Sequence, residues 1–182
     1  MLTHEIADDV ELRLLQLHHA GEIFSVVEQN RDYLRQWLPW VDRTHGPDDT
    51  RSFIEKSLKE FAGGSGLALG IWCGGQFAGT VGCHPFDLAN RRAEIGYWIA
   101  KQWQGRGMVT AACRALIDHL FDDLGMHRVE IRADPANDKS RRIPERLGFV
   151  QEGVAREAQY RNGSWHDLVV YSTLRDEWNA RH

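Results

Sequence analysis

A strand pattern passes into a helix pattern through a short glycine-containing loop in residues 94–112, EIGYWIAKQWQGRGMVTAA. The β-prone segment Ile95–Ile99 precedes the loop, and apolar residues recur at helical spacing over Val109–Leu124 behind it. The two loop glycines leave no Cβ in the way of an incoming group. The first turn of a helix adds unpaired N–H donors and the positive end of its dipole. This arrangement predicts a phosphate-binding corner at Gln102–Met108.

Two known phosphate loops do not fit this corner. The nucleoside-triphosphate loop needs Lys followed by Ser or Thr after its second glycine, where this chain has Met108-Val109. The dinucleotide fingerprint needs Gly or Ala where Thr110 stands, and the corner lies in mid-chain rather than in a leading βαβ unit. The sequence therefore favours another phosphorylated ligand. A glycine-rich connection that binds nothing is the alternative.

Length and composition indicate a soluble globular protein. The chain has 182 residues, 42% apolar and 26% charged, which predicts a single domain over residues 1–182. No apolar run approaches the ~20 residues that span a bilayer. The N-terminal segment also lacks the basic and apolar regions of a secretion signal. Cys73, Cys83 and Cys113 are odd in number, which favours reduced thiols and a cytoplasmic location.

The charge balance and the histidines argue against two kinds of partner. A net charge of −4 disfavours general binding to nucleic acid and suits a cationic substrate such as an amine. The nine histidines are scattered, and neither an HExxH nor a CxxC motif occurs. We therefore expect no metal site.

The order of the predicted elements is strand, helices, hairpin, strand, long helix, strand, short helix and hairpin. Gly74-Gly75 and Asn162-Gly163 mark the two hairpin turns, and Gly96 inside a strand predicts a bulge or a close backbone approach. This order predicts an α/β fold with a mixed, largely antiparallel central sheet flanked by helices. The predicted strands are Val10–Leu17, Leu67–Cys73, Gln76–His84, Arg91–Ile99, Arg128–Ala133, Phe149–Gln159 and Trp165–Leu174; the predicted helices are Ala20–Gln29, Arg31–Leu38, Pro47–Phe61, Val109–Leu124 and Ser140–Leu147.

Four motifs follow one another along the chain. They are L-x-x-W-L-P-W at 34–40, E-I-G-Y-W at 94–98, Q-x-x-G-x-G at 102–107, and N-x-x-S followed by L-G-F within 137–149. Together they resemble the GNAT superfamily of acetyl-CoA-dependent N-acetyltransferases, in its RimJ/RimL-type branch of ribosomal-protein N-terminal acetyltransferases and relatives. Two positions depart from the pattern. Met108 replaces a common aromatic residue, and Pro144 falls inside a predicted helix, where it would remove a hydrogen bond.

The resemblance implies the GNAT (acyl-CoA N-acyltransferase) fold and acetyl-CoA, or coenzyme A, as co-substrate. In that fold the strands at Glu94 and Val129 separate to admit the co-substrate. Its pantetheine arm then bonds the strand backbone at Trp98, Ile99 and Ala100. The residues expected to hold its pyrophosphate are Gln102, Gln104, Gly105, Arg106, Gly107 and Met108.

The resemblance also implies catalytic roles. Glu94 is the expected base toward the acceptor amine, directly or through a water, and an ion pair with Arg91 or Arg92 is its alternative role. Ser140 is the expected donor to the departing thiolate, and an N-cap of the following helix is its alternative role. A backbone N–H freed by the bulge at Gly96 would face the oxyanion.

Binding roles follow from the same resemblance. Asn137 is expected to bond the pantetheine amide, or else to be a simple turn residue. Trp37 and Trp40 are expected to cover the acceptor site, or else to anchor the core. Tyr160 and Tyr171 are weaker candidates for the thiolate donor. Basic side chains that would meet the 3′-phosphate of coenzyme A, unless they form a solvated face, are Lys139, Arg141 and Arg142. Arg106 in the loop is preferred to them for this contact.

The identity of the amine decides how much help a base must give. At pH 7 an α-amino group is roughly 10–20% neutral and a lysine side chain ~0.04% neutral. The expected function is acetyl transfer from acetyl-CoA to a protein N-terminal α-amine of the ribosomal-protein type. A small-amine acetyltransferase, acting on a polyamine or an amine antibiotic, is the first alternative. A non-catalytic acyl-CoA-binding or sensing module is the second. The branch also suggests a homodimer.

Overall fold

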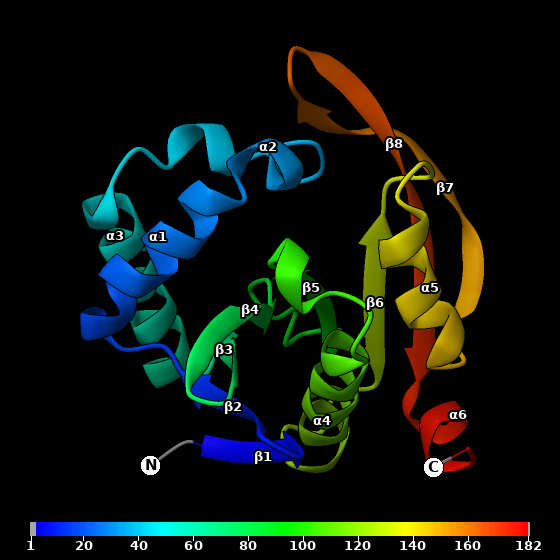
Figure 1. The fold of residues 1–182 in the computed structure, drawn as a ribbon. Coiled ribbons are helices and arrows are strands. Elements are labelled where there is room, and N and C mark those ends of the chain that lie inside the picture. Colours follow the sequence, from blue (N-terminus) through cyan, green and yellow to red (C-terminus); the bar gives the residue numbers. More distant parts are fainter. Residues whose placement is uncertain (1–2, 182) are drawn as a thin grey trace.

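The computed structural model of the chain describes residues 3–181, whose strands form one sheet (Figure 1). The strand order is β1-β2-β3-β4-β5-β6-β8-β7. Among the paired strands of residues 3–181, only β5 and β6 run parallel, so the predicted mixed, largely antiparallel sheet is confirmed. The strands are β1 Thr3–Ala7, β2 Val10–Leu14, β3 Leu67–Cys73, β4 Gln76–Cys83, β5 Arg92–Ile99, β6 Arg128–Ala133, β7 Val150–Arg161 and β8 Ser164–Leu174.

Helices cover the sheet and enclose two apolar clusters. Because successive strand residues point to opposite faces, Ile71 and Trp72 of β3 belong to different clusters. α1 and α3 enclose the Trp72 cluster, and α4 packs into the cluster of Ile71. Figure 1 shows where these helices lie around the sheet. Among residues 3–181 no helix has the length and apolar character needed to cross a bilayer. The helices are α1 Ala20–Gln29, α2 Arg31–Leu34, α3 Pro47–Ala62, α4 Met108–Asp122, α5 Asp138–Arg146 and α6 Arg175–Asn179.

β5 and β6 separate partway along their length. Their pairing ends with Ile95 opposite Ile131, although both strands continue beyond that point. β5 stays in unbroken register with β4 through Gly96, so the predicted bulge is wrong. The edge of β5 that faces β6 is free because the pairing with β6 ends, and not because a bulge inserts an extra residue. α4 connects these two strands, as the order of elements predicts.

α2 is shorter than the sequence pattern predicts. It ends at Leu34 rather than at Leu38. Pro39 disfavours the helical conformation at Leu38, the residue directly before it. The chain continues as a turn, in which the N–H groups of Trp37 and Leu38 both bond the Leu34 carbonyl. This turn places the tryptophan-containing segment beside the sheet instead of extending a helix away from it.

Two elements have no clear sequence signal. β1 lies at the sheet edge, and its five residues are half-buried or exposed, so it carries no apolar pattern. α6 has five residues, too few for a visible helical period. β2 ends at Leu14 rather than at Leu17, where a 3-10 turn begins. The other predicted elements are found within two residues of their predicted bounds.

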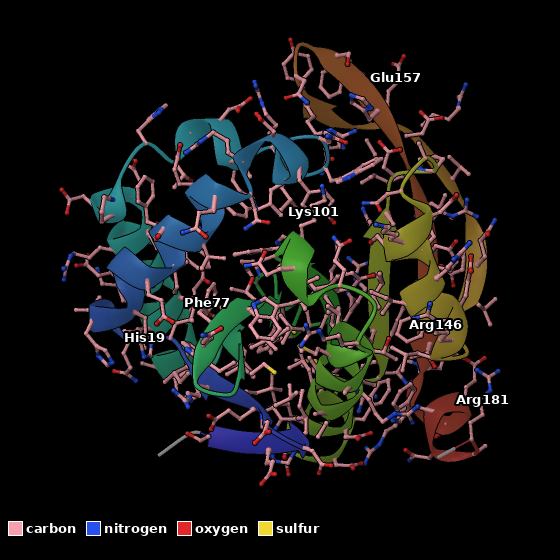
Figure 2. The ribbon with its side chains drawn as sticks, in the orientation of Figure 1. His19, Phe77, Lys101, Arg146, Glu157 and Arg181 are labelled. Atoms are coloured by element: carbon pink, nitrogen blue, oxygen red, sulfur yellow. The ribbon has the colours of Figure 1, made fainter. Side chains whose placement is uncertain are left out.

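The hairpin of β7 and β8 extends beyond the rest of the sheet and reaches the N-terminal helices (Figure 1). Its turn residues Asn162 and Gly163 have φ angles of 51° and 81°, as a two-residue type I′ turn requires. Near Glu157 (Figure 2) the register shifts, and such a bulge bends a strand. At the tip, the Asn162 side chain donates to the Arg35 carbonyl at 3.0 Å.

Candidate active site

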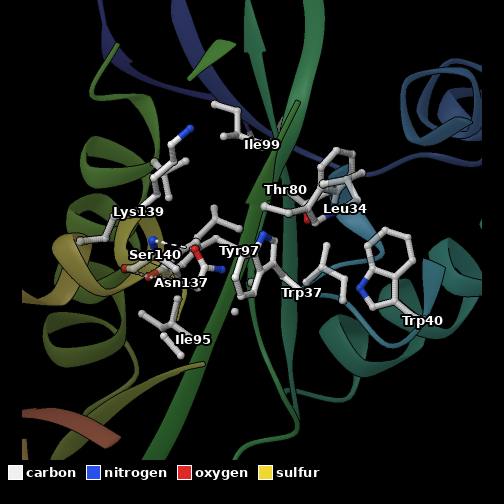
Figure 3. A pocket seen from close by; sticks show the side chains of 18 of the residues that line it. Leu34, Trp37, Trp40, Thr80, Ile95, Tyr97, Ile99, Asn137, Lys139 and Ser140 are labelled. Carbon is white, nitrogen blue, oxygen red and sulfur yellow. Dashed lines mark hydrogen bonds between the residues drawn. The ribbon is translucent and has the colours of Figure 1, made fainter. Parts of the chain in front are cut away.

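A cavity of about 1000 Å³ lies where β5 and β6 separate. Figure 3 shows Asn137, Lys139 and Ser140 at the start of α5 on one side of β5, and Leu34 and Trp40 on the other side. The cavity therefore lies between the two helical layers. Most residues predicted for the site line it: Trp37, Trp40, Glu94, Trp98, Ile99, Gln104, Gly105, Arg106, Gly107, Met108, Asn137 and Ser140.

The loop between β5 and α4 forms the predicted corner. Gly105 and Gly107 have φ angles of 75° and 77°, in the left-handed region that favours glycine. A Cβ on either residue would point into open space. The Ala111 N–H bonds the Gly107 carbonyl, so the N–H groups of residues 108–110 come before the bonded part of α4. The corner is a cradle of backbone donors suited to a phosphate.

Side chains brace this corner. The Arg106 guanidinium lies 4.7 Å from the centroid of the Trp103 ring. The Gln104 side chain donates to the Tyr33 hydroxyl and accepts from Lys139 Nζ at 2.9 Å. Gln102 is exposed and is not among the described residues that line the cavity. The 3-10 turn of residues 101–103 directs its neighbour Trp103 toward the cavity instead.

The free backbone edge of β5 belongs to Tyr97 and Ile99. In an antiparallel pair, successive residues direct their backbone groups alternately toward and away from the partner. The Ala100 N–H bonds the Ala78 carbonyl at 2.8 Å, so Ala100 and, by alternation, Trp98 face β4. Tyr97 and Ile99 face the gap left by β6. Ala100 is buried outside the lining, and Trp98 lines the cavity although its backbone groups face β4.

Glu94 lines the cavity from β5, with 33% of its side chain exposed. Its Oε2 lies 3.3 Å from Arg132 Nε, and its Oε1 lies 3.9 Å from His84 Nε2. The alternative role predicted for Glu94, an ion pair with Arg91 or Arg92, names the wrong partner. Arg92 pairs with other carboxylates, and Arg91 stands in a turn with a φ of 48°. The neighbouring strand β6 supplies the partner, which a single-strand pattern does not reveal.

Arg132 is held on its other side by Glu130, whose Oε2 lies 3.0 Å from Arg132 Nη2. Burial alone would raise the pKa of Glu130, but hydrogen bonds from Arg128 and Arg132 outweigh it, so this pKa is lowered. Glu130 is buried and stays ionised at neutral pH. It thereby fixes the arginine that in turn positions Glu94.

Asn137 and Ser140 lie at the start of α5. Asn137 is the N-cap, and its Oδ1 accepts from the Ser140 N–H at 3.2 Å. The N-cap role considered for Ser140 is therefore wrong, because the helix begins two residues earlier than predicted. The Ser140 hydroxyl donates to the Tyr97 hydroxyl oxygen at 3.3 Å, and the Tyr97 hydroxyl donates to the Ser140 carbonyl at 2.9 Å.

The basic face of α5 differs from the prediction at one position. Arg141 turns away from the cavity and donates to the Tyr171 hydroxyl at 2.9 Å and to the Pro135 carbonyl at 3.1 Å. Tyr171 is thus engaged elsewhere, and Tyr160 is 56% exposed. The described lining includes neither tyrosine. The basic residues of α5 that do line the cavity are Lys139, Arg142 and Arg146, the last of which follows Arg142 by one helical turn.

Trp37 and Trp40 line the end of the cavity formed by the segment that follows α2. The Trp40 ring lies 6.0 Å from the Trp98 ring, measured between centroids. The Trp37 ring lies 5.7 Å from the Arg161 guanidinium carbon. Both tryptophans therefore pack against other residues and face the cavity, so the two roles considered for them are compatible.

Arg161 and Asp134 also line this end, and the sequence patterns do not single them out. Arg161 is 4% exposed, and its Nη2 lies 2.7 Å from Asp134 Oδ2. Its Nη1 donates to the Trp37 carbonyl at 3.4 Å. Burial alone would raise the pKa of Asp134, but hydrogen bonds from Arg161 and the Ala136 N–H outweigh it and lower that pKa. We call these contacts the Arg161 clamp.

In the described part of the chain, no three His, Cys, Asp or Glu side chains gather as a metal-binding group. The donors at the cavity are backbone N–H groups, hydroxyls, side-chain amides, a lysine and arginines. This set suits an anionic ligand with an extended polar arm.

Comparisons with known proteins give consistent findings. The model of the family described as "Acetyltransferase (GNAT) domain" matches residues 9–150. The putative ribosomal N-acetyltransferase YdaF of Bacillus subtilis is 40% identical, over 99% of this chain and 99% of that protein. The ribosomal-protein-serine acetyltransferase of Escherichia coli is 25% identical, over 96% and 97%.

A solved structure extends the likeness to the fold and the co-substrate. It is a RimL ribosomal-protein α-N-acetyltransferase in complex with coenzyme A. The TM-score is 0.91 at 26% identity, covering 94% of this chain and 97% of that chain.

Proposed function

The chain belongs to the GNAT family of acetyltransferases and moves an acetyl group from acetyl-CoA to an amine, and we propose that this amine is the N-terminal α-amine of a ribosomal protein. One observation carries the proposal. Relatives named for ribosomal-protein acetylation match this chain over nearly its whole length, including both sides of the cavity. We place the enzyme in the cytoplasm, where both substrates occur. Homodimerisation stays a prediction, which the mass of the protein in solution tests.

The cavity fits the co-substrate. The N–H cradle of the corner opens onto free space, as a pyrophosphate requires. The unpaired edge at Tyr97 and Ile99 can bond the amides of the pantetheine arm as a neighbouring strand would, and the Asn137 side chain lies across the gap. Basic side chains proposed to face the 3′-phosphate are Lys139, Arg142 and Arg146.

Acetyl-CoA supplies an activated thioester carbonyl. When the amine nitrogen bonds to that carbon, the carbon–sulfur bond breaks, the amine gives up a proton and the sulfur gains one. We assign Glu94 to receive the amine proton, directly or through a water, since it lines the cavity and Arg132 holds it in place. We assign Ser140 to donate a hydrogen bond to the sulfur from the opposite wall.

Peptides with a free N-terminus are expected to be acetylated roughly 250- to 500-fold faster, in kcat/KM, than the same peptides with a blocked N-terminus and a free lysine. The reason is the larger neutral fraction of an α-amine, roughly 10–20% against ~0.04% at pH 7. Thiol release from acetyl-CoA, measured over N-terminal peptides of ribosomal proteins and over spermidine, checks this. Turnover of spermidine alone would contradict the proposed acceptor and favour the small-amine reading. Coenzyme A binding without turnover of any amine would favour a sensor.

Replacing Glu94 with Gln is expected to lower kcat about 10- to 100-fold, with little change in the KM for acetyl-CoA. The amide keeps the shape of the side chain but cannot accept the proton. Steady-state kinetics with an N-terminal peptide measure the effect. Glu11→Gln is the matched control, because Glu11 also pairs with an arginine on the sheet but lies outside the described cavity lining. An E94Q variant as active as the control would remove Glu94 from the mechanism.

A further inference from the structure

Pro144 leaves one carbonyl of α5 without its helical partner. In an α-helix the N–H of residue i+4 bonds the carbonyl of residue i, so position 144 should supply the donor for Ser140. Pro144 stands inside α5, well past its first turn, and proline has no N–H. The carbonyl that loses its partner belongs to Ser140, which lines the cavity.

Tyr97 supplies the missing donor from another element. Its hydroxyl lies 2.9 Å from the Ser140 carbonyl oxygen and donates to it, although the two residues are 43 positions apart. Tyr97 belongs to β5 and Ser140 to α5, so this bond spans the region where β5 and β6 have separated (Figure 3). The backbone of Tyr97 belongs at the same time to the free strand edge described above.

The same phenol sets the direction of the Ser140 hydroxyl. Tyr97 has one proton, which is directed to the Ser140 carbonyl, so its oxygen can only accept from Ser140 Oγ, at 3.3 Å. Desolvation by burial raises the pKa of Tyr97, so the phenol keeps its proton at neutral pH. With its N–H bonded to Asn137 Oδ1, Ser140 is held at three atoms: N, O and Oγ.

The bond from the Ser140 hydroxyl is the longest of the three. At 3.3 Å it exceeds the usual length of a hydroxyl-to-oxygen hydrogen bond, about 2.7–2.8 Å. A better acceptor can therefore take this hydrogen bond at small cost, while the two backbone bonds keep the residue in place. The sulfur of coenzyme A, which becomes negatively charged as the carbon–sulfur bond of acetyl-CoA breaks, would be such an acceptor.

We propose that Tyr97 is a positioning residue for Ser140, and that Pro144 gives it this role by leaving the Ser140 carbonyl open to the phenol. The inference rests on the proposed function, in which Ser140 donates a hydrogen bond to the sulfur of coenzyme A. Tyr97 holds the serine hydroxyl at the cavity wall through a long hydrogen bond, which the hydroxyl can exchange for one to that sulfur.

The test compares Tyr97→Phe, Ser140→Ala, Pro144→Ala and the Tyr97→Phe/Pro144→Ala double variant. Tyr97→Phe leaves the Ser140 carbonyl without a donor and the Ser140 hydroxyl without an acceptor. We expect a lower Tm and a kcat reduced about 10-fold, with the KM for acetyl-CoA changed less than 2-fold. Adding Pro144→Ala restores an N–H for the carbonyl, so Tm should recover. The kcat should stay low, because nothing orients the serine hydroxyl.

A kcat that recovers together with Tm in the double variant would overturn the proposal, since Tyr97 would then be merely structural. Tyr171→Phe is the matched control. It removes another tyrosine hydroxyl bonded to α5, through Arg141 and Glu145, and should lower Tm without changing kcat.

Failure of the proposal and failure of the underlying function give different results. A Ser140→Ala variant with wild-type kcat would refute the assigned role of Ser140 itself. If Ser140→Ala is slow, Tyr97→Phe added to it should cause no further loss of kcat, because there is no hydroxyl left to position. A full additional 10-fold loss in that background would leave Ser140 in its role and remove Tyr97 from it.

Discussion

A valine at position 105 is expected to weaken coenzyme A binding about 1000-fold while the protein stays folded. Gly105 has a φ of 75°, a conformation that a β-branched residue rarely adopts, and its Cβ would stand in the space proposed for the pyrophosphate. Two or three charge-assisted hydrogen bonds would be lost or distorted, each worth about 1.5–3 kcal/mol, and ~4 kcal/mol corresponds to about 1000-fold. Isothermal titration with coenzyme A measures the loss.

Gly64→Val is the matched control for this variant. Gly64 also has a positive φ, 64°, and open space around its missing Cβ, but it lies outside the described cavity lining. Both variants therefore bear a similar backbone strain, of about 1–2 kcal/mol, and should show similar losses of Tm. Coenzyme A should bind the Gly64 variant normally. Unchanged affinity in Gly105→Val would show that the pyrophosphate does not lie at the corner.

An alanine in place of Arg161 is expected to destabilise the protein by about 3 kcal/mol. The change leaves Asp134, whose side chain is only 10% exposed, as a carboxylate without its arginine, and removal of one partner of a buried pair is strongly destabilising. For a chain of this size the loss corresponds to ~6–12 °C in Tm. Denaturant unfolding and calorimetry measure it.

Arg35→Ala is the matched control, because the Arg35–Asp42 pair is about half exposed on both sides and should contribute below ~1 kcal/mol. The pH dependence tests the cause. The lowered pKa of Asp134 contributes stability above the pKa of an unfolded Asp, ~3.9, which is lost as the pH falls through the folded value. The deficit of the Arg161 variant should therefore shrink below about pH 4. A deficit that does not depend on pH would mean that packing, rather than the ion pair, holds the clamp.

Local patterns predict the corner and most of the elements. The strand before Gln104, the two glycines and the apolar face of α4 are neighbours in sequence, so backbone propensity and periodicity suffice to place them. The turn at Asn162-Gly163 likewise needs only its own residues, because few residues accept two positive φ angles. Most cavity residues could be predicted because they belong to these short-range features or to the motifs of the family resemblance.

The parts that the patterns miss depend on contacts between distant segments. Arg132 reaches Glu94 because β6 pairs with β5, and Arg161 meets Asp134 and Trp37 because a bent hairpin crosses to the N-terminal turn. No spacing of residues in the sequence predicts these contacts of Arg132 and Arg161. The direction of backbone groups at Ala100 also depends on pairing, since register with β4 decides which edge each residue presents.

The bridge made by Gln104 between Tyr33 and Lys139 has a consequence for the order of events in turnover. The loop that would grip the diphosphate is already tied to both walls, and Arg106 already lies against Trp103. Little conformational freedom remains to be lost when the nucleotide end arrives, so association should be quick and should not wait for the acceptor. Rapid-mixing experiments should therefore show that acetyl-CoA binds first and that the peptide then binds to a preformed site.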